Sequence, residues 1–234
     1  MIEGLPLLEP GHIVWFGEMH GTEESPRFVG DVVEQAAAAA ATSRHRVQLG
    51  LEIAADEQAA IDRYLGDGDR RALIEGPFWH GQDGRSTPAM VALIERVRTL
   101  RATVSIVAFD ARADGDPDRA MADAVMRARD PEALFIGLSG NIHSRRTRWN
   151  DITPLVAHLV AAGLPVTTYN VVSAGGTFWG CVSRGPGEPV CGEHRNFADR
   201  DASPAWTLGP ARDDSHDGVY FVGVTKASPP LRSR

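Results

Sequence analysis

The sequence predicts an α/β fold, a three-layer sandwich around a mostly parallel β-sheet with additional strands toward the C-terminus. Short apolar segments alternate with helical patterns five times between residues 12 and 172. The chain has 234 residues, 43% of them hydrophobic, which is enough for a core without disulfide or metal support. Because no linker divides it, we expect one domain over 1–234, with a core of about 12–172 and an extension of strands and a hairpin at 173–234.

The expected strands are short runs rich in β-branched and aromatic residues. The first, HIVWF, ends at Gly17, and one more strand is expected near the C-terminus. The full set is 12–16, 45–53, 103–109, 133–139, 164–172 and 218–224.

The expected helices carry start signals and one apolar face. Ser25 is a candidate N-cap, with Pro26 at the first helical position, and Pro117 begins another helix in the same way. Glycine and aspartate make 66–85 irregular or only partly helical. The helices are expected at 25–41, 55–65, 86–101, 116–129 and 152–163.

Charge and hydropathy exclude several classes of partner. With 24 Lys and Arg against 31 Asp and Glu, the net charge of −7 argues against nucleic acid or an anionic membrane. No apolar run approaches the roughly 20 residues of a transmembrane helix. The N-terminus lacks a signal-peptide pattern, so we expect a cytoplasmic protein, or an exported one if a signal segment has been removed. The expected partner is a small-molecule or peptide substrate.

The two cysteines, Cys181 and Cys191, flank the turn-rich stretch SRGPGEPV. If that stretch forms a hairpin, they face each other and can pair, and a disulfide would indicate an oxidising compartment. Two unpaired thiols are the alternative. Cys191 and His194 alone are too few ligands for zinc.

Polar side chains follow four of the expected strands. Ligands bind outside the carboxyl ends of strands in open α/β sheets, so these residues are the candidate site. The first two strands end in GEMHG and LEIA, the next two in FDAR and SGNIHSRR. The candidates are Glu18, His20, Glu52, Asp110, Arg112, Asn141, His143 and Arg145.

Each candidate alone has a structural explanation. Asp110 can cap a helix, Glu52 can be a solvated loop acid, and the arginines at 145, 146 and 148 can form a solvated face. Repetition favours function instead, because GEMH and GNIH share the form Gly-x-x-His after apolar strands. In such a motif, glycine can let the backbone turn sharply.

Other motifs are absent or incomplete. No GxGxxG, Walker or HExxH pattern occurs. Asn141 stands where a nucleophile elbow around Ser139 needs its last glycine. The aspartates at 114, 116 and 118 resemble a calcium loop, but Arg119 and Val125 replace the required glycine and glutamate.

These motifs in this order resemble the superfamily that joins erythromycin esterases, ChaN-type haem-uptake proteins, and the TraB and Tiki proteins. The resemblance rests on GEMHGTEE, LGLEI and LSGNIH, and it covers roughly 12–172. The segments at 78–90 and 119–125 resemble the ChaN-like bacterial branch in particular.

The resemblance implies several activities for the shared positions Glu18, His20, Glu52 and His143. Erythromycin esterases hydrolyse a lactone with a histidine that activates water, Tiki proteins resemble metal-dependent peptidases, and ChaN-type proteins bind haem. The chain lacks the large helical insertions of the esterases, which argues against a macrolide substrate. It also lacks the signal sequence and lipobox of exported ChaN lipoproteins.

The leading hypothesis is a hydrolase. An imidazole with an ordinary pKa near ~6.5 suits His20 to take a proton from water, with Glu18 or Glu52 orienting it. His143, Asn141 and Arg145 would stabilise the oxyanion, with Asp110 also binding substrate. In a metal-assisted version, Glu18, His20, Glu52 and His143 hold zinc, manganese or iron.

The alternative hypothesis is a binding protein for haem or another small ligand. Tyr64, Tyr169, Tyr220 and the histidines are candidate axial ligands. Phe78, Trp79 and His80 would then form an apolar lid, although packing is the alternative role for these side chains.

Overall fold

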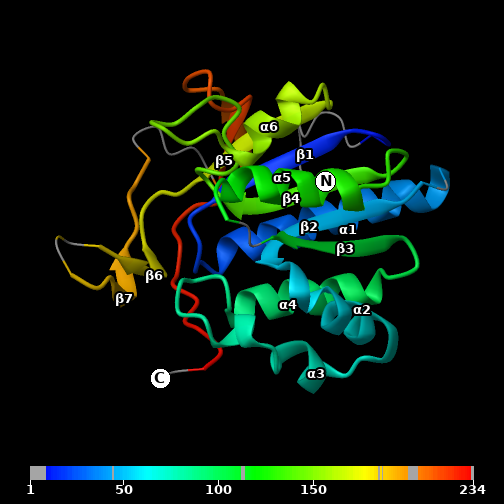
Figure 1. Cartoon of the computed structure of the whole chain (residues 1–234), viewed down its shortest axis with the longest axis horizontal. Helices are drawn as coiled ribbons and strands as arrows, with labels where there is room; N and C mark the ends of the chain where they lie inside the picture. The colour runs from blue at the N-terminus through cyan, green and yellow to red at the C-terminus, as the bar shows by residue number, and fades with distance from the viewer. Residues whose placement is uncertain are drawn as a thin grey trace.

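A seven-stranded sheet in the order β3-β2-β4-β1-β5-β9-β8 forms the centre of the protein (Figure 1). This computed structural model describes residues 9–43, 45–111, 114–183, 185, 187–199 and 205–232. All neighbouring strands pair in parallel except β8 and β9, which are antiparallel. The predicted α/β sandwich with additional C-terminal strands is therefore confirmed.

The strands of this sheet are β1 (Ile13–Glu18), β2 (Val47–Ala54), β3 (Val104–Asp110), β4 (Leu134–Gly140), β5 (Val166–Val172), β8 (Thr207–Pro210) and β9 (Gly218–Phe221). A separate hairpin consists of β6 (Thr177–Val182) and β7 (Val190–Arg195). The helices are α1 (Glu24–Ser43), η1 (Ala55–Glu57), α2 (Gln58–Asp67), α3 (Arg70–Ile74), η2 (Pro77–His80), α4 (Pro88–Thr99), α5 (Pro117–Ala128) and α6 (Leu155–Ala161).

The helices cover both faces of the sheet, and strand β1 packs against both layers. Val14 and Phe16 belong to the core formed with α1, α2 and α4, whereas Ile13 and Trp15 belong to the core formed with α5 and α6. All four side chains are fully buried. This burial on both faces explains why the first strand is a continuous apolar run rather than an alternating one.

The strand register brings the two Gly-x-x-His motifs together. β1 lies between β4 and β5 in the sheet. Gly17 pairs with Ser139 and Glu18 with Gly140, so β1 and β4 end at the same level. The loops that follow them, which carry His20 and His143, therefore leave the sheet side by side at its carboxyl edge.

Two local expectations differ from the structure, and a third agrees with it. Ser25 is not the N-cap, because α1 begins at Glu24 and Ser25 is buried inside its first turn. The 66–85 segment is partly helical, as expected, since it contains α3 and η2. Helix α6 is shorter than expected because Pro154 precedes its first residue.

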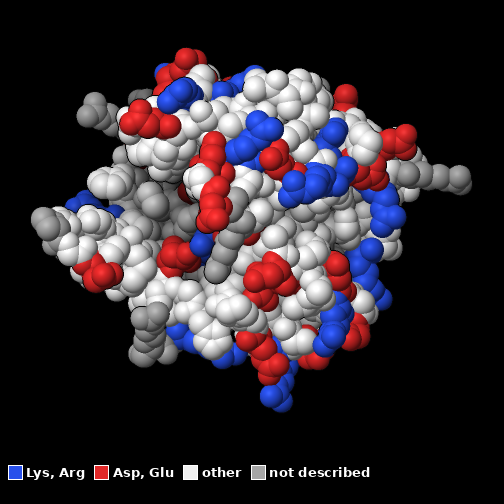
Figure 2. Space-filling view, in the orientation of Figure 1, with Lys and Arg blue, Asp and Glu red and all other residues white. Residues whose placement is uncertain are grey.

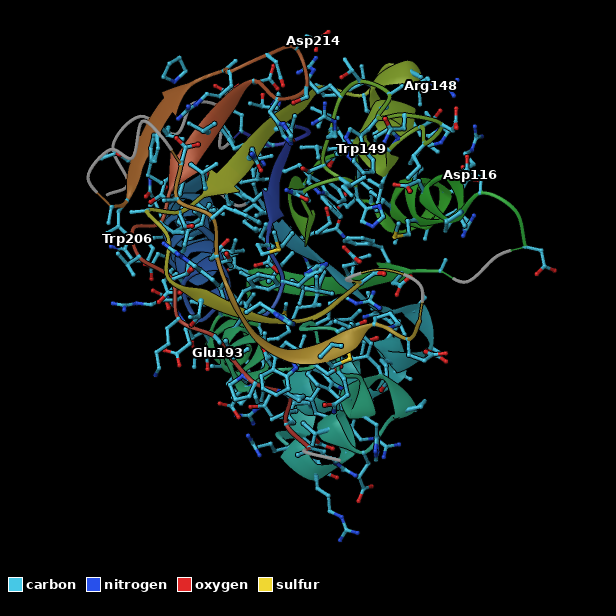
Figure 3. The ribbon with its side chains drawn as sticks, turned by 90° about the vertical axis from the view of Figure 1, so that its left-hand side faces the viewer. Asp116, Arg148, Trp149, Glu193, Trp206 and Asp214 are labelled. Atoms are coloured by element: carbon cyan, nitrogen blue, oxygen red, sulfur yellow. A yellow bond between two sulfur atoms is a disulfide. The ribbon has the colours of Figure 1, made fainter. Side chains whose placement is uncertain are left out.

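The C-terminal extension folds back over the carboxyl edge. Cys181 and Cys191 are opposite each other in the β6–β7 hairpin and form a disulfide (Figure 3), so the pairing left open by the sequence does occur. Trp179 of β6 donates its amide to the Gly21 carbonyl at 2.9 Å and its indole N–H to the Gln82 carbonyl at 3.1 Å. The hairpin thus holds the loop after β1 and the loop before Arg85.

The surface charge and the apolarity of the helices bear on possible partners. Positive and negative side chains are interspersed over the face in Figure 2. No helix in the described part of the chain has the length and apolarity to cross a membrane.

Candidate functional site at the carboxyl edge of the sheet

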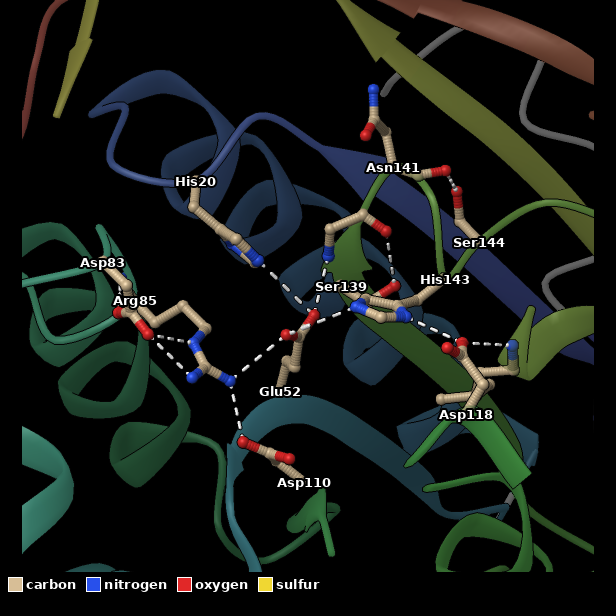
Figure 4. A network of polar contacts seen from close by, with 12 residues as sticks. His20, Glu52, Asp83, Arg85, Asp110, Asp118, Ser139, Asn141, His143 and Ser144 are labelled. Carbon is tan, nitrogen blue, oxygen red and sulfur yellow. Dashed lines mark hydrogen bonds and ion pairs between the residues drawn. The ribbon is translucent and has the colours of Figure 1, made fainter. Parts of the chain in front are cut away.

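His20 lies between two buried carboxylates. Its Nδ1 is 2.9 Å from Oε1 of Glu18, the last residue of β1, and its Nε2 is 3.5 Å from Oε2 of Glu52 in β2 (Figure 4). Glu18 and Glu52 are only 3% and 8% exposed. The imidazole of His20 therefore has an acceptor at each nitrogen and favours its protonated form.

His143 approaches the same Glu52 from the other side. Its Nε2 is 3.9 Å from Glu52 Oε1, and its Nδ1 is 2.7 Å from Oδ1 of Asp118. Asp118 lies in the first turn of α5, where the same oxygen also accepts the amide N–H of Leu155 at 2.7 Å. Helix α5 thus supplies the acceptor that orients the His143 ring.

Arg85 completes the cluster with a positive charge. Its Nη1 donates to Glu52 Oε1 at 3.2 Å and to Asp110 Oδ2 at 2.7 Å. Its Nη2 donates to Asp83 Oδ2 at 2.7 Å. The predicted Asp110 is therefore joined to the site through Arg85 rather than through either histidine (Figure 4).

The two motif glycines provide space rather than a sharp turn. Neither Gly17 nor Gly140 has a positive φ. A Cβ on Gly17 would lie 1.8 Å from Ser144 Oγ, and one on Gly140 would lie 3.0 Å from His20 Nε2. The amide N–H of Gly140 also donates to Glu52 Oε2 at 2.8 Å. Each glycine thus admits a side chain that belongs to the other motif's loop.

The electrostatics of the cluster shift the pKa values of both histidines and of Glu52. Burial opposes the charged form of His20, but Glu52 and Glu18 outweigh it and raise its pKa to about 10. Burial likewise opposes the charge on Glu52, but His20, His143 and Arg85 lower its pKa well below the usual range. His143 also has a raised pKa, because Asp118 and Glu52 outweigh its burial.

The donors of the expected metal site are held by contacts with other side chains. The Nδ1 atoms of His20 and His143 are each engaged by a carboxylate, and Arg85 already binds Glu52. Among the described residues, no group of three or more His, Cys, Asp or Glu side chains is arranged to hold a metal ion. The expected zinc, manganese or iron site at Glu18, His20, Glu52 and His143 is thus not seen among the described residues and stays a prediction, and Arg85 supplies positive charge beside Glu52.

Two predicted oxyanion ligands, Asn141 and Arg145, have other surroundings than the histidines. The Asn141 side chain is directed away from Glu52 in Figure 4. The backbone N–H of Asn141 donates to the Glu18 carbonyl at 2.9 Å. Arg145 lies near Asp213, whose pKa is lowered mainly by hydrogen bonds from Ser215, and near His216, whose pKa is lowered mainly by burial, and its charge contributes to both shifts.

The neighbouring arginines lie outside the cluster. Arg146 pairs with Asp217, and Arg148 is exposed on the loop after β4 (Figure 3). Arg112 lies outside the described residues.

The candidate haem ligands and lid are packed into the protein. Tyr64, Tyr169 and Tyr220 are at most 6% exposed. Trp79 is fully buried and Phe78 packs on it edge to face, whereas His80 is exposed. Of the described residues considered as axial ligands, exposed His80 is therefore accessible, whereas the three tyrosines and His216 are buried.

Sequence reasoning missed Asp118 and Arg85. Asp118 stands on the face of α5 that buries Met121, Ala122 and Val125, and an acid in that pattern is the signal that would have identified it. Arg85 has no such signal, because its position depends on the folded 78–85 loop and on the hairpin that holds that loop.

Comparisons with known proteins show what this fold resembles. No family model matches the chain, and no curated protein sequence does. A succinoglycan biosynthesis protein matches with a TM-score of 0.67 at 10% identity, over 93% of this chain and 89% of the other. An erythromycin esterase variant in its open conformation matches with 0.66 at 12% identity, over 97% and 94%. ChaN of Campylobacter jejuni, described with cofacial haem binding, matches with 0.52 at 13% identity, over 71% and 83%.

At these identities the likeness concerns the fold alone. It confirms, at the level of the fold, the resemblance that the paired Gly-x-x-His motifs indicate. The chain has the α/β fold that erythromycin esterase and ChaN share.

Proposed function

We propose that the protein is a metal-independent hydrolase of an ester, lactone or peptide bond. The observation that carries the proposal is the placement of two histidines on either side of one buried carboxylate, Glu52, each with a second carboxylate of its own. Buried groups with strongly shifted pKa values, gathered at the carboxyl edge of a parallel sheet, are typical of an active site. The esterase among the proteins of this fold supports the same class of reaction.

The two histidines have different environments, which favour different roles. His20 contacts two carboxylates and has a pKa raised to about 10, so it is an imidazolium at neutral pH. In that state its Nε2–H donates to the oxyanion that develops on the substrate carbonyl. This assignment differs from the sequence-based expectation that His20 takes the proton from water.

His143 is the better general base. Asp118 accepts its Nδ1–H, which leaves the electron pair of Nε2 to take a proton from water, and Asp118 then stabilises the imidazolium that forms. Glu52 faces both Nε2 atoms and orients the attacking water. The hydroxide adds to the carbonyl carbon, and His143 returns the proton to the leaving oxygen or nitrogen as the bond breaks.

A substrate panel with histidine variants tests this proposal. Ester, lactone, amide and peptide substrates are assayed with the wild type, His20→Ala, His143→Ala and, as the matched control, His45→Ala, because His45 is exposed and distant in sequence from both motifs. We expect turnover of at least one bond class by the wild type and by the control, and loss of turnover in the other two variants. Chelator should leave the rate unchanged. Near-normal rates in both site variants, or loss of activity on chelation, would contradict the proposal.

Haem binding is the second candidate function, because ChaN has the same fold. The buried tyrosines leave histidines as ligands, such as exposed His80 or His194, which lines a cavity of about 440 Å³. Titration of the chain with haem tests this candidate. A Soret band that shifts in His80→Ala or His194→Ala supports it, and no spectral change with excess haem contradicts it.

A further inference from the structure

A second feature of the carboxyl edge is a cavity of about 260 Å³ beside the cluster. Met19, which separates Glu18 from His20, lines it, as does Asn141, which directly follows Gly140. Asn170 of β5 forms its floor together with residues of the C-terminal extension. In the strand order, Glu52 on β2 and Asn170 on β5 lie on opposite sides of β1, so the cavity continues the site across the sheet.

The lining of this cavity is polar but carries almost no charge. Among the described residues, no lysine or arginine lines it, and the single carboxylate, Asp199, pairs with Arg212. The remaining side chains are carboxamides, hydroxyls and apolar groups, and the carboxamides are those of Asn141, Asn170 and Asn196. Such a lining favours an uncharged group over an anion.

Two of these carboxamides have unused hydrogen-bonding capacity. Oδ1 of Asn170 is buried and has no hydrogen-bond partner in the described part of the chain. The Asn141 carboxamide also makes no hydrogen bond to any described residue, and Figure 4 shows it pointing away from Glu52. Asn196, by contrast, donates to Thr225 and accepts from the amide of Phe197. A buried polar atom without a partner destabilises the protein, and a ligand that hydrogen-bonds to it removes that cost.

We propose that this cavity binds an uncharged part of the substrate that carries both hydrogen-bond donors and acceptors, either an amide or a hydroxyl group. The group docks on Asn141 and Asn170 and holds the adjoining carbonyl at His20 and His143. The cavity is smaller than the roughly 300–1,000 Å³ of drug-sized sites, so it takes one amino-acid residue or one sugar ring rather than a whole ligand. The role in catalysis rests on the proposed hydrolase function, whereas the binding does not.

Ligand titration by NMR tests the chemistry of the cavity. The probes are N-acetylglycinamide, methyl β-glucopyranoside, acetate and methylammonium, and the observed signals are the side-chain NH₂ groups of Asn141 and Asn170. We expect the amide or the glycoside to shift these signals saturably and the two ions to leave them unchanged. The neutral probe that binds shows whether the natural ligand is a peptide or a sugar. Binding of an ion as tight as that of the neutral probes, or no shift with any probe, overturns the proposal.

Two variants of Asn170 sharpen the test. Asn170→Leu removes the unpaired oxygen at similar volume and should weaken neutral-probe binding about fivefold to tenfold. Asn170→Asp keeps the shape, which guards against misfolding of the leucine variant, and should shift the preference toward methylammonium. Asn150→Gly is the control, because Asn150 is exposed and has a φ of 51° that glycine accepts. Unchanged binding in both Asn170 variants overturns the proposal.

Failure of this proposal can be separated from failure of the hydrolase proposal. His20→Ala should lose turnover while the probes still bind with wild-type affinity. Turnover by the wild type without probe binding would overturn the cavity alone. Probe binding without turnover on any panel substrate would overturn the hydrolase alone.

Discussion

Asp118 accepts the Nδ1–H of His143 at 2.7 Å, although the two residues lie on different elements, α5 and the loop after β4. The same Asp118 oxygen holds the Leu155 amide at the start of α6. One buried carboxylate therefore fixes both the ring of His143 and the helix that follows its loop.

Replacing Asp118 with asparagine should lower activity by about 100-fold or more, because the amide no longer stabilises the imidazolium of His143. The pKa of His143 should fall toward its ordinary value. Asparagine keeps an oxygen for the Leu155 amide, so the free energy of unfolding should change little. Rates and the NMR titration of His143 check this. An unchanged His143 pKa with full activity would show that the contact has no role in catalysis.

The rate should depend on pH in a bell shape. His143 must be neutral as base, so kcat/KM rises as pH passes its raised pKa, above 6.5. His20 must be protonated, so kcat/KM falls again as pH approaches about 10. Glu18→Gln removes one of the two acids that raise the pKa of His20 and should move the alkaline limb to lower pH. An alkaline limb that does not move in this variant would assign that limb to another group.

Arg85→Lys should reduce activity by about tenfold, since one ammonium cannot span Glu52, Asp83 and Asp110 as the guanidinium does. Arg70→Lys is the matched control, because Arg70 pairs with Glu95 at the surface. Steady-state rates of the two variants are compared at equal folded fraction. Equal rates in both would mean that the charge of residue 85 matters and its geometry does not.

The stability of the protein should fall between pH 6.5 and about 4 because of His216. This ring is 8% exposed and is hydrogen-bonded to Ser144 and Ser215, and burial together with nearby Arg145 lowers its pKa to about 4. Within that window the unfolded chain binds a proton that the folded chain does not, so lowering the pH favours unfolding. The effect is at most about 3 kcal/mol.

Urea unfolding at pH 7 and pH 4.5 measures this effect. The wild type should lose more stability between the two pH values than His216→Gln, with His45→Gln behaving as the wild type. Parallel losses in all three proteins would assign the effect to carboxylates instead.

Loss of the disulfide should loosen the β6–β7 hairpin. Cys181 and Cys191 are 10 residues apart, and closing a loop of that size contributes about 2–3 kcal/mol in the chain-entropy treatment. In a variant with both cysteines changed to serine, hydrogen exchange should become faster at the Trp179 amide, while the amides of β1 and β4 keep their protection. Faster exchange throughout the sheet would instead indicate that the hairpin supports the whole fold.

The fold was predictable because its signals are local and repeated. Each strand of the parallel core is an apolar run, and most helices begin with proline or carry one apolar face, so alternation alone indicates the sandwich. Glu18, His20, Glu52 and His143 were predictable as a group because parallel strands end at one edge. The direction of each side chain was not predictable. Arg145 follows His143 by only two residues, yet its charge contributes to the lowered pKa values of Asp213 and His216, because a loop rather than a strand carries it.

The reciprocal fit of Gly17 against Ser144 and of Gly140 against His20 has a consequence for how this site can change in evolution or design. Neither motif can be exchanged alone, since a bulkier residue in one meets a side chain of the other. A chimera that receives only the first loop from a protein of the same fold should therefore fail where a chimera that receives both succeeds. We therefore expect the two motifs to change together, even though more than a hundred residues separate them in the chain.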